Sequence, residues 1–81
     1  MSKRAVLAVL KRLEFAHELV GDPRKARVFK GAQWPLRSLT EDFEGVLERG
    51  ELTRIRGIGR GVERVARQVM GGEEPQELAQ L

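Results

Sequence analysis

The residues of this chain whose types and spacing could do chemistry gather around a glycine-rich segment at residues 55–61. Its three glycines are Gly57, Gly59 and Gly61. Glycine has no Cβ, so it permits a positive φ and lets a ligand come close to the backbone. The apolar pattern that follows predicts a helix, and the unpaired N–H groups and positive dipole end of that helix would face the same space. Four arginines surround the turn: Arg54, Arg56, Arg60 and Arg64. The last three are candidates for direct phosphate contact. Together these residues predict a site for phosphate groups, as in the hairpin of a helix-hairpin-helix element.

Two other interpretations of these glycines are open. A glycine pair before a helix can be a tight structural turn without a ligand. A nucleotide-binding loop of the Rossmann type requires a preceding strand and the wider spacing G-x-G-x-x-G. Residues 52–55 are too short and too charged for a buried parallel strand, and no Walker lysine follows Gly59. The pattern therefore favours nucleic-acid phosphate, and the structural turn is the main alternative.

Length and composition restrict the class of protein. The chain has 81 residues, which suits one small domain, and it has no apolar run of membrane-spanning length. Lys11 and Arg12 interrupt the first apolar run and no cleavage site follows, so we expect no secretion signal. There is no cysteine, and a single histidine, His17, cannot build a zinc site. We expect a cytoplasmic monomer, either complete or a fragment of a longer chain with a catalytic domain downstream.

The charges are segregated along the chain, although the net charge is only +3. Residues 22–37 carry five basic side chains against one acidic one, and residues 51–70 carry five arginines against two glutamates. Residues 38–50 and the C-terminal tail are acidic. This segregation is typical of a protein that binds a polyanion and turns its acidic segments away. Arg24 and Lys25, in the first basic segment, are candidates for a second phosphate contact.

Hydrophobic periodicity predicts helices and no strand. A first helix should run from about residue 5 to Val20 and end at Gly21. Its buried face would consist of Val6, Val9, Leu10, Leu13, Ala16 or His17, and Val20. Asp22 and Pro23 predict the N-cap and first residue of a second helix. The inward residues of that helix would be Ala26, Phe29 and Ala32.

Pro35 should end or kink the second helix near Trp34, because proline lacks a backbone donor and clashes with the preceding turn. We expect Trp34 to anchor this end against a third helix; the alternative is that its ring stacks on an unpaired base. Ser38 or Thr40 should cap the third helix, which would end at Gly50. The inward residues of the third helix would be Phe43, Val46 and Leu47.

The last part of the chain should hold a short turn at residues 51–55 and a final long helix from Arg60 or Gly61 to Met70. The inward residues of that helix would be Val62, Ala66 and Val69. Residues 73–81 should form a frayed or short final turn, unless Leu78 and Leu81 dock on the body. The sequence therefore predicts an all-α, compact four-helix domain, with a fifth helix if the extra turn forms.

Several of these motifs recur in a known order. They are Gly21-Asp22-Pro23, then Lys25, Arg27 and Phe29, then Leu52-Thr53 and Ile55-x-Gly57-Ile58-Gly59, and then a closing helix and glycine. In this order they resemble the amino-terminal domain of the family X DNA polymerases, from about Ala5 to about Leu78. The resemblance implies a single domain over residues 1–81 with a helix-hairpin-helix motif at about residues 50–71. It also implies DNA as the partner, contacted without sequence preference at gaps or 5′-phosphate ends, in DNA repair or replication.

Some members of that family are lyases, in which a lysine amine forms a Schiff base with an abasic sugar. The resemblance places the nucleophilic lysine at Val65, and further pocket lysines at Gly61 and at about Glu77. It preserves one pocket lysine, Lys25. Arginine cannot substitute for the missing lysines because its guanidinium stays charged. We therefore expect no catalytic residue in this chain.

Two other functions stay open from the sequence. The main alternative is a protein-interaction domain in which the hairpin only packs. The third is a 5′-deoxyribose phosphate lyase with Lys25 or Lys30 as a substitute nucleophile. The resemblance also implies that the backbone carbonyls of a hairpin can hold Na⁺ or K⁺, and we expect no other cofactor. The matching positions are Thr53, Ile55 and Ile58.

Overall fold

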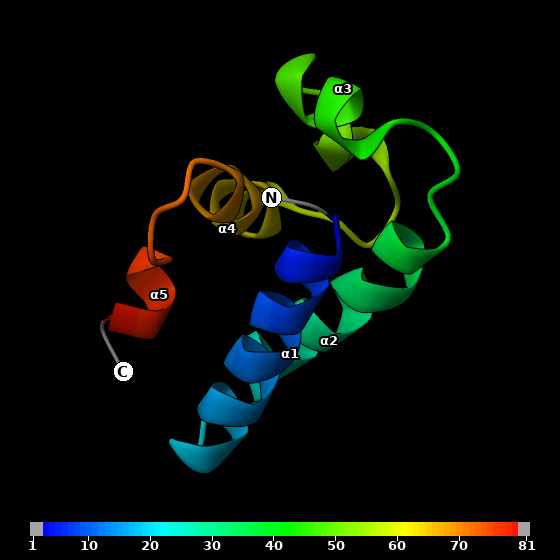
Figure 1. The fold of residues 1–81 in the computed structure, drawn as a ribbon. Coiled ribbons are helices and arrows are strands. Elements are labelled where there is room, and N and C mark those ends of the chain that lie inside the picture. Colours follow the sequence, from blue (N-terminus) through cyan, green and yellow to red (C-terminus); the bar gives the residue numbers. More distant parts are fainter. Residues whose placement is uncertain (1–2, 80–81) are drawn as a thin grey trace.

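Helices α1 (Lys3–Leu19) and α2 (Pro23–Arg37) form an antiparallel pair in the computed structural model, which describes residues 3–79 (Figure 1). Gly21, with φ +78°, lets the chain reverse at the end of α1. The N–H of Asp22 closes this end by donating to the carbonyl of His17 at 2.8 Å. The carboxylate of Asp22 then accepts from the N–H of Lys25 at 3.2 Å and caps α2. The predicted boundary between the two helices is confirmed.

The two helices pack through the faces that their spacing predicts. The buried residues are Val6, Leu10, Leu13 and His17 from α1, and Ala26, Phe29, Ala32 and Leu36 from α2. The imidazole of His17 stacks on the ring of Phe29, with the ring centroids 5.5 Å apart. One predicted core position is wrong: Val20 lies beyond the end of α1 and is 61% exposed.

Of the two effects predicted for Pro35, an end of α2 near Trp34 is wrong, because the helix continues through Pro35 to Arg37. The alternative, a kink, stays a prediction. Proline cannot donate to the carbonyl of Gly31, so one helical hydrogen bond is missing. The next turn nevertheless forms: the N–H of Ser38 donates to the carbonyl of Trp34 at 2.9 Å. A helix tolerates one missing bond when the following turn is held from outside.

The ammonium group of Lys3 supplies that external support. Its Nζ donates to the carbonyl of Leu39 at 3.0 Å and to that of Arg37 at 3.5 Å. A cation at this place satisfies the free carbonyls of a helix C-terminus and interacts well with its dipole. The support does not come from Trp34, whose side chain is 71% exposed. The expected anchor against the third helix is therefore absent, and the tryptophan faces solvent.

Helix α3 (Phe43–Glu48) is short and follows an irregular connection. Its N-cap is Asp42, so the prediction of Ser38 or Thr40 is wrong; the backbone stays non-helical for longer than the pattern of polar residues suggests. The helix ends at Gly50, with φ +69°, as predicted. The three predicted inward residues are all buried: Phe43, Val46 and Leu47.

A single 3₁₀ turn, η1 (Leu52–Arg54), and a loop lead into helix α4 (Arg60–Met70). Figure 1 shows α4 nearly end-on, so it crosses the α1–α2 pair instead of running along it. Its buried residues are Val62, Val65, Ala66 and Val69. Three of these were predicted; Val65 is a further core residue and is fully buried. Gly71 and Gly72 end the helix, as predicted.

The C-terminal segment docks on the body through helix α5 (Gln76–Ala79). Pro75 is buried, and Leu78 packs against the core. The carboxylate of Glu77 lies 3.6 Å from Nε2 of His17. Docking by Leu78 is thus confirmed, whereas Leu81 lies outside the described residues.

The all-α class is confirmed: residues 3–79 form five α-helices and one 3₁₀ turn, with no strand. The helix-hairpin-helix motif stays a prediction. The radius of gyration is 11.8 Å, against about 12 Å for a compact domain of this length. Among the described helices, none combines the length and the apolar character that crossing a membrane requires.

Candidate nucleic-acid interface

The loop of residues 55–59 is held in place by a turn and by one buried side chain. The N–H of Ile58 donates to the carbonyl of Ile55 at 3.1 Å. The side chain of Ile58 is buried in the core, and that of Ile55 packs against it. With the isoleucines directed inward, Arg56 and the neighbouring glycines are left exposed on the outer side of the loop. The apolar residues thus position the polar ones.

Gly57 is required by the fold itself. Its φ of +95° lies where side chains are strained, and a Cβ built there would meet Cγ of Pro35 at 3.1 Å and the carbonyl oxygen of Gly31 at 3.3 Å. The loop therefore packs tightly against the second half of α2, beside the carbonyl that Pro35 leaves without a helical partner. At this position the structural role of the glycine is independent of any ligand.

Gly59 and Gly61 differ from Gly57 because neither is forced by packing. Gly59 is the N-cap of α4, with an extended φ of −100°, and no side chain caps the helix there. A Cβ at Gly59 or at Gly61 would meet nothing within 4 Å. The first N–H groups of α4 therefore open toward solvent without an obstructing side chain. An open helix N-terminus of this kind can accept an oxyanion.

The three arginines at this end of α4 are exposed and unpaired. Arg56, Arg60 and Arg64 form no ion pair with any carboxylate in the described part of the chain. Arg60 and Arg64 are four residues apart on one helix, so they lie on the same face. The nearby Glu63 lies 3.9 Å from Arg67 and leaves this face positive. The result is a cluster of three cations beside an open helix N-terminus.

Arg24 and Lys25 lie apart from this cluster along α2. Both are exposed and occupy the first turn of the helix. The loop packs against Gly31 and Pro35 in the second half. At 1.5 Å per residue, the Cα of Arg24 lies about 10 Å along the axis from that of Gly31. These two residues are a second centre of positive charge and are not part of the turn.

The carbonyls predicted to hold a monovalent cation all belong to η1 and the loop. Of these, the carbonyl of Ile55 already accepts from the N–H of Ile58. A carbonyl oxygen has a second lone pair, so cation binding by Thr53, Ile55 and Ile58 stays a prediction. Over residues 3–79 no three His, Cys, Asp or Glu side chains are grouped to hold a metal ion.

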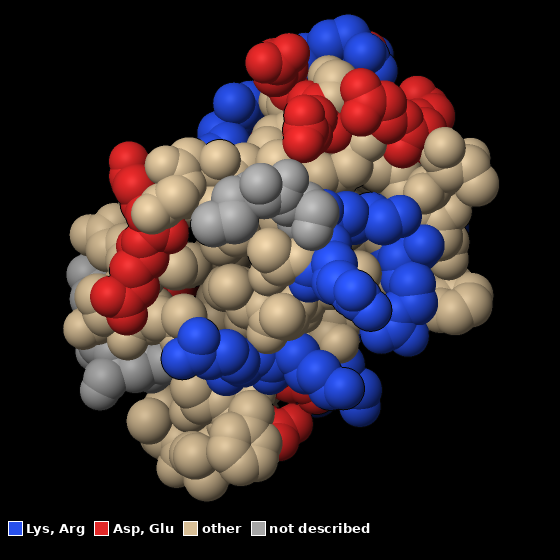
Figure 2. Space-filling view, viewed as in Figure 1, with Lys and Arg blue, Asp and Glu red and all other residues tan. Residues whose placement is uncertain are grey.

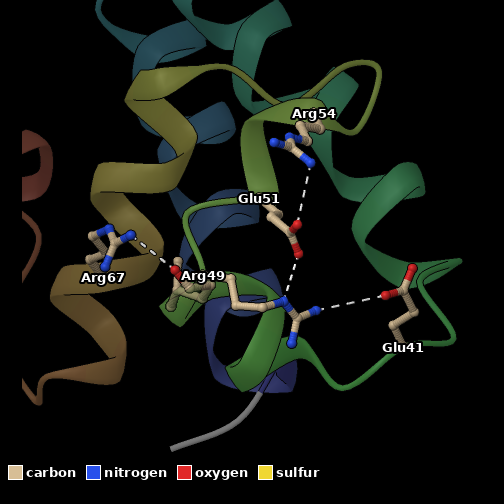
Figure 3. Close-up of polar contacts among 6 residues, drawn as sticks. Glu41, Arg49, Glu51, Arg54 and Arg67 are labelled. Carbon is tan, nitrogen blue, oxygen red and sulfur yellow. Dashed lines mark hydrogen bonds and ion pairs between the residues drawn. The ribbon is translucent and has the colours of Figure 1, made fainter.

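In residues 41–54 the arginines are engaged by carboxylates instead (Figure 3). Glu51 bridges two of them: its Oε1 lies 2.6 Å from Nε of Arg49, and its Oε2 lies 3.3 Å from Nη1 of Arg54. Arg49 also reaches Glu41, at 3.9 Å. The hydrogen bond from Arg49 and the positive charges of both arginines lower the pKa of Glu51, and the same hydrogen bond raises the pKa of Arg49.

Arg67 is engaged as well, although it belongs to α4. Its Nη2 donates at 2.9 Å to the carbonyl of Leu47, near the C-terminus of α3, which also accepts from the N–H of Gly50. Arg54 and Arg67 both fall in the basic segment that the sequence marks as a polyanion site. Their carboxylate partners are close in sequence: Glu51 is three residues before Arg54, and Glu63 is four residues before Arg67. Only the contact of Arg67 with Leu47 joins distant parts of the chain, and the local charge pattern carried no signal of it.

Charges of opposite sign are partly separated on the surface. On the face drawn in Figure 2, acidic atoms gather over α3 at the top and along the C-terminal segment at the left, most basic atoms lie at the centre right and below, and a few lie at the top beside the acidic ones. One basic feature was missed by sequence reasoning. Trp34 stands in an exposed row on α2 with three cations, and the 3–4–3 spacing of these residues was the available signal: Arg27, Lys30 and Arg37.

We compared the chain with known proteins in three ways. No protein-family model matched it, and no match was found among curated proteins or among solved structures. The likeness to the family X DNA polymerases therefore rests on the order of the sequence motifs.

Proposed function

We propose that this domain binds DNA through its phosphates and without sequence preference. The binding element is a helix-hairpin-helix formed by η1, the loop of residues 55–59 and α4. The observation that carries the proposal is the contrast in arginine pairing: those beside the open N-terminus of α4 form no ion pair within residues 3–79, whereas those in the preceding segment are paired with carboxylates. Free cations beside unpaired N–H groups suit a phosphate.

Each part of the site has a role in this proposal. Backbone N–H groups at Gly59, Gly61 and the residue between them hold one or two phosphate groups. The adjacent arginines add positive charge: Arg56, Arg60 and Arg64. Arg24 and Lys25 contact a phosphate further along the same strand. Phosphate contacts fix position and carry no sequence information, so selectivity is for DNA structure, with gaps and 5′-phosphate ends preferred.

The salt dependence of binding tests this proposal. Neutralising four to six phosphates predicts that log K falls with log salt at a slope of about −4 to −5 on duplex DNA. Binding would be measured by anisotropy of a labelled duplex over a salt series. A slope near zero, or no binding in about 50 mM salt, would overturn the proposal and favour a protein-interaction domain.

A variant at Gly59 connects the binding to the hairpin. Gly59→Val fits an extended φ and open space, so the fold should persist while the side chain obstructs the N–H groups. Losing one charge-assisted hydrogen bond of about 1.5–3 kcal/mol predicts a loss of affinity of tenfold or more. Ala8→Val, which adds similar bulk at an exposed position on α1, is the matched control. Equal affinity of the two variants would place the DNA elsewhere.

We also propose that the domain binds without catalysis. Val65, where the resemblance puts a nucleophilic lysine, is fully buried in the core, so that position faces no substrate. A lysine introduced there would bury its ammonium group, which predicts unfolding instead of gained activity. Borohydride should not trap the unmodified domain on a 5′-deoxyribose phosphate. Trapping that Lys25→Ala abolishes would contradict this proposal and make Lys25 the nucleophile.

A further inference from the structure

Trp34 lies in a row of exposed basic residues on the outer face of α2. We call Arg27, Lys30, Trp34 and Arg37 the Trp34 row. The successive spacings of three, four and three residues place all four on one face of the helix. Every member is exposed, and Trp34 as a residue is 71% exposed. The inward residues of α2 lie on the opposite face and form the core.

The charge around this tryptophan distinguishes it from the other exposed apolar residues. Phe15, on α1, is also exposed, with Lys11 and Arg12 one turn before it, but the carboxylate of Glu18 lies one turn after it. Single exposed apolar side chains are common in soluble proteins. The Trp34 row combines a large aromatic surface with three cations and contains no carboxylate. Arg27 and Lys30 also line a surface hollow of about 240 Å³, which has Glu18 on its wall. Aromatic rings among cations are what unpaired nucleic-acid strands bind.

The Trp34 row is adjacent to the hairpin. Gly57 packs against Pro35, the residue next to Trp34, and against Gly31, which precedes Trp34 by three residues. A strand whose phosphates lie at the hairpin can therefore continue onto this face of α2. From Arg27 to Arg37 the row measures about 15 Å along the axis, which corresponds to about four stacked nucleotides at ~3.4 Å each.

We propose that the Trp34 row is a second subsite, which binds an unpaired single strand where it leaves the duplex held at the hairpin. One base stacks on the indole of Trp34, and the flanking phosphates contact the three cations of the row. The inference rests on the proposed function, since the hairpin supplies the duplex end. It adds a ligand class, unpaired nucleotides, and a place where they bind.

Three labelled ligands separate the subsite from the hairpin: a blunt duplex, the same duplex with a short oligothymidylate overhang, and the same duplex with an abasic overhang of equal charge. Stacking of one base contributes about 1–3 kcal/mol, so the wild-type domain should prefer the thymidylate overhang to the abasic one by about fivefold to hundredfold. Trp34→Ala should abolish this preference and leave affinity for the blunt duplex within about twofold. The emission of the only tryptophan should be quenched by the thymidylate overhang alone.

Matched variants complete the design. Phe15→Ala removes an exposed aromatic side chain outside the row and should change none of the three affinities. Lys30→Gln should lower the salt slope by about 1 on the overhang and leave the slope on the blunt duplex unchanged. Trp34→Phe should restore part of the preference.

Two outcomes would overturn this inference: a wild-type domain that binds both overhangs equally, or a preference that survives in Trp34→Ala. Failure of the proposed function looks different. In that case the blunt duplex does not bind, or Gly59→Val does not weaken its binding.

Discussion

In the segment from Glu41 to Arg54 both arginines face carboxylates, whereas the three arginines of residues 55–64 face solvent. Glu51 holds Arg49 and Arg54 in the first segment (Figure 3). In the second, none of the three forms an ion pair within residues 3–79. The two segments adjoin in sequence and contain the same cationic side chain, so the difference lies in what surrounds the guanidinium groups.

The number of arginines in a segment therefore differs from the number of guanidinium groups that are available to a ligand. Exposed ion pairs contribute little to stability, but they occupy the cation. The basic segment of residues 51–70 has five arginines. Arg54 and Arg67 are engaged with partners on the protein. Within residues 3–79, only Arg56, Arg60 and Arg64 combine exposure, the absence of a carboxylate partner and a place beside the open N-terminus of α4.

Removing the three hairpin charges should have the largest effect. The triple variant in which Arg56, Arg60 and Arg64 become Gln should lower the salt slope on duplex DNA by about 3. At about 0.1 M salt this corresponds to a loss of affinity of more than hundredfold. Anisotropy titrations would measure both quantities, and circular dichroism would verify that the helices remain.

The paired arginines provide the control for that variant. Arg49→Gln combined with Arg54→Gln should change duplex affinity by no more than about twofold, because these guanidinium groups are neutralised locally. If the double variant loses as much affinity as the triple one, the distinction between free and engaged arginines does not govern binding.

The hairpin glycines should separate into one that holds the turn and one that gives access. Gly57→Ala introduces a side chain at φ +95° and at 3.1 Å from Cγ of Pro35. We expect it to lower the free energy of unfolding by about 2 kcal/mol. Gly59→Ala meets open space and an extended backbone, so its cost should stay below about 1 kcal/mol. Urea denaturation would measure both, and equal losses would show that the loop does not depend on the contact with α2.

Sequence reasoning predicted the parts of the fold that local pattern determines. The boundary at Gly21 to Pro23 and the buried faces of α3 and α4 follow from capping residues and from helical periodicity. The same reasoning failed at Pro35, because the support for the last turn of α2 comes from Lys3, which is 34 residues away from Arg37 in sequence. Local pattern cannot represent a contact of that kind.

The candidate site shows the same limit. The glycines and arginines of the hairpin stood out in the sequence, and the structure exposes them. The sequence did not reveal that Gly57 packs on α2 or that Trp34 faces solvent. Both facts depend on which face of α2 contacts the loop of residues 55–59, and tertiary packing determines that face.

Two arginines on the same helix sharpen the comparison further. Arg67→Gln removes a donor from the carbonyl of Leu47, and we expect it to lower the free energy of unfolding by about 1 kcal/mol. Arg64→Gln removes an exposed, unpaired side chain and should change stability by less than about 0.5 kcal/mol. The effects on duplex affinity should be the reverse, with a loss at Arg64 and none at Arg67. If both variants lose affinity equally, Arg67 contacts DNA in addition to α3.

The smallest expected effect is on the pH dependence of stability, through the ion pairs that Glu51 forms with Arg49 and Arg54. The hydrogen bond from Arg49 lowers the pKa of Glu51 below its ordinary value of 4.5 in the folded protein. The stability that this carboxylate contributes is therefore fully present above that ordinary pKa, and it is lost as the pH falls through the lowered pKa of the folded state. In Glu51→Gln the decrease of Tm between neutral pH and about pH 3 should be smaller than in the wild-type domain, because one carboxylate no longer has to be protonated. The difference should remain below the effect of Arg67→Gln, since the network is exposed.

Glu74→Gln, at an exposed position outside the network, should leave the pH profile unchanged. Thermal denaturation over this pH series decides the question. If Tm depends on pH identically in Glu51→Gln and in the wild-type domain, the ion pairs of Glu51 contribute nothing measurable to stability.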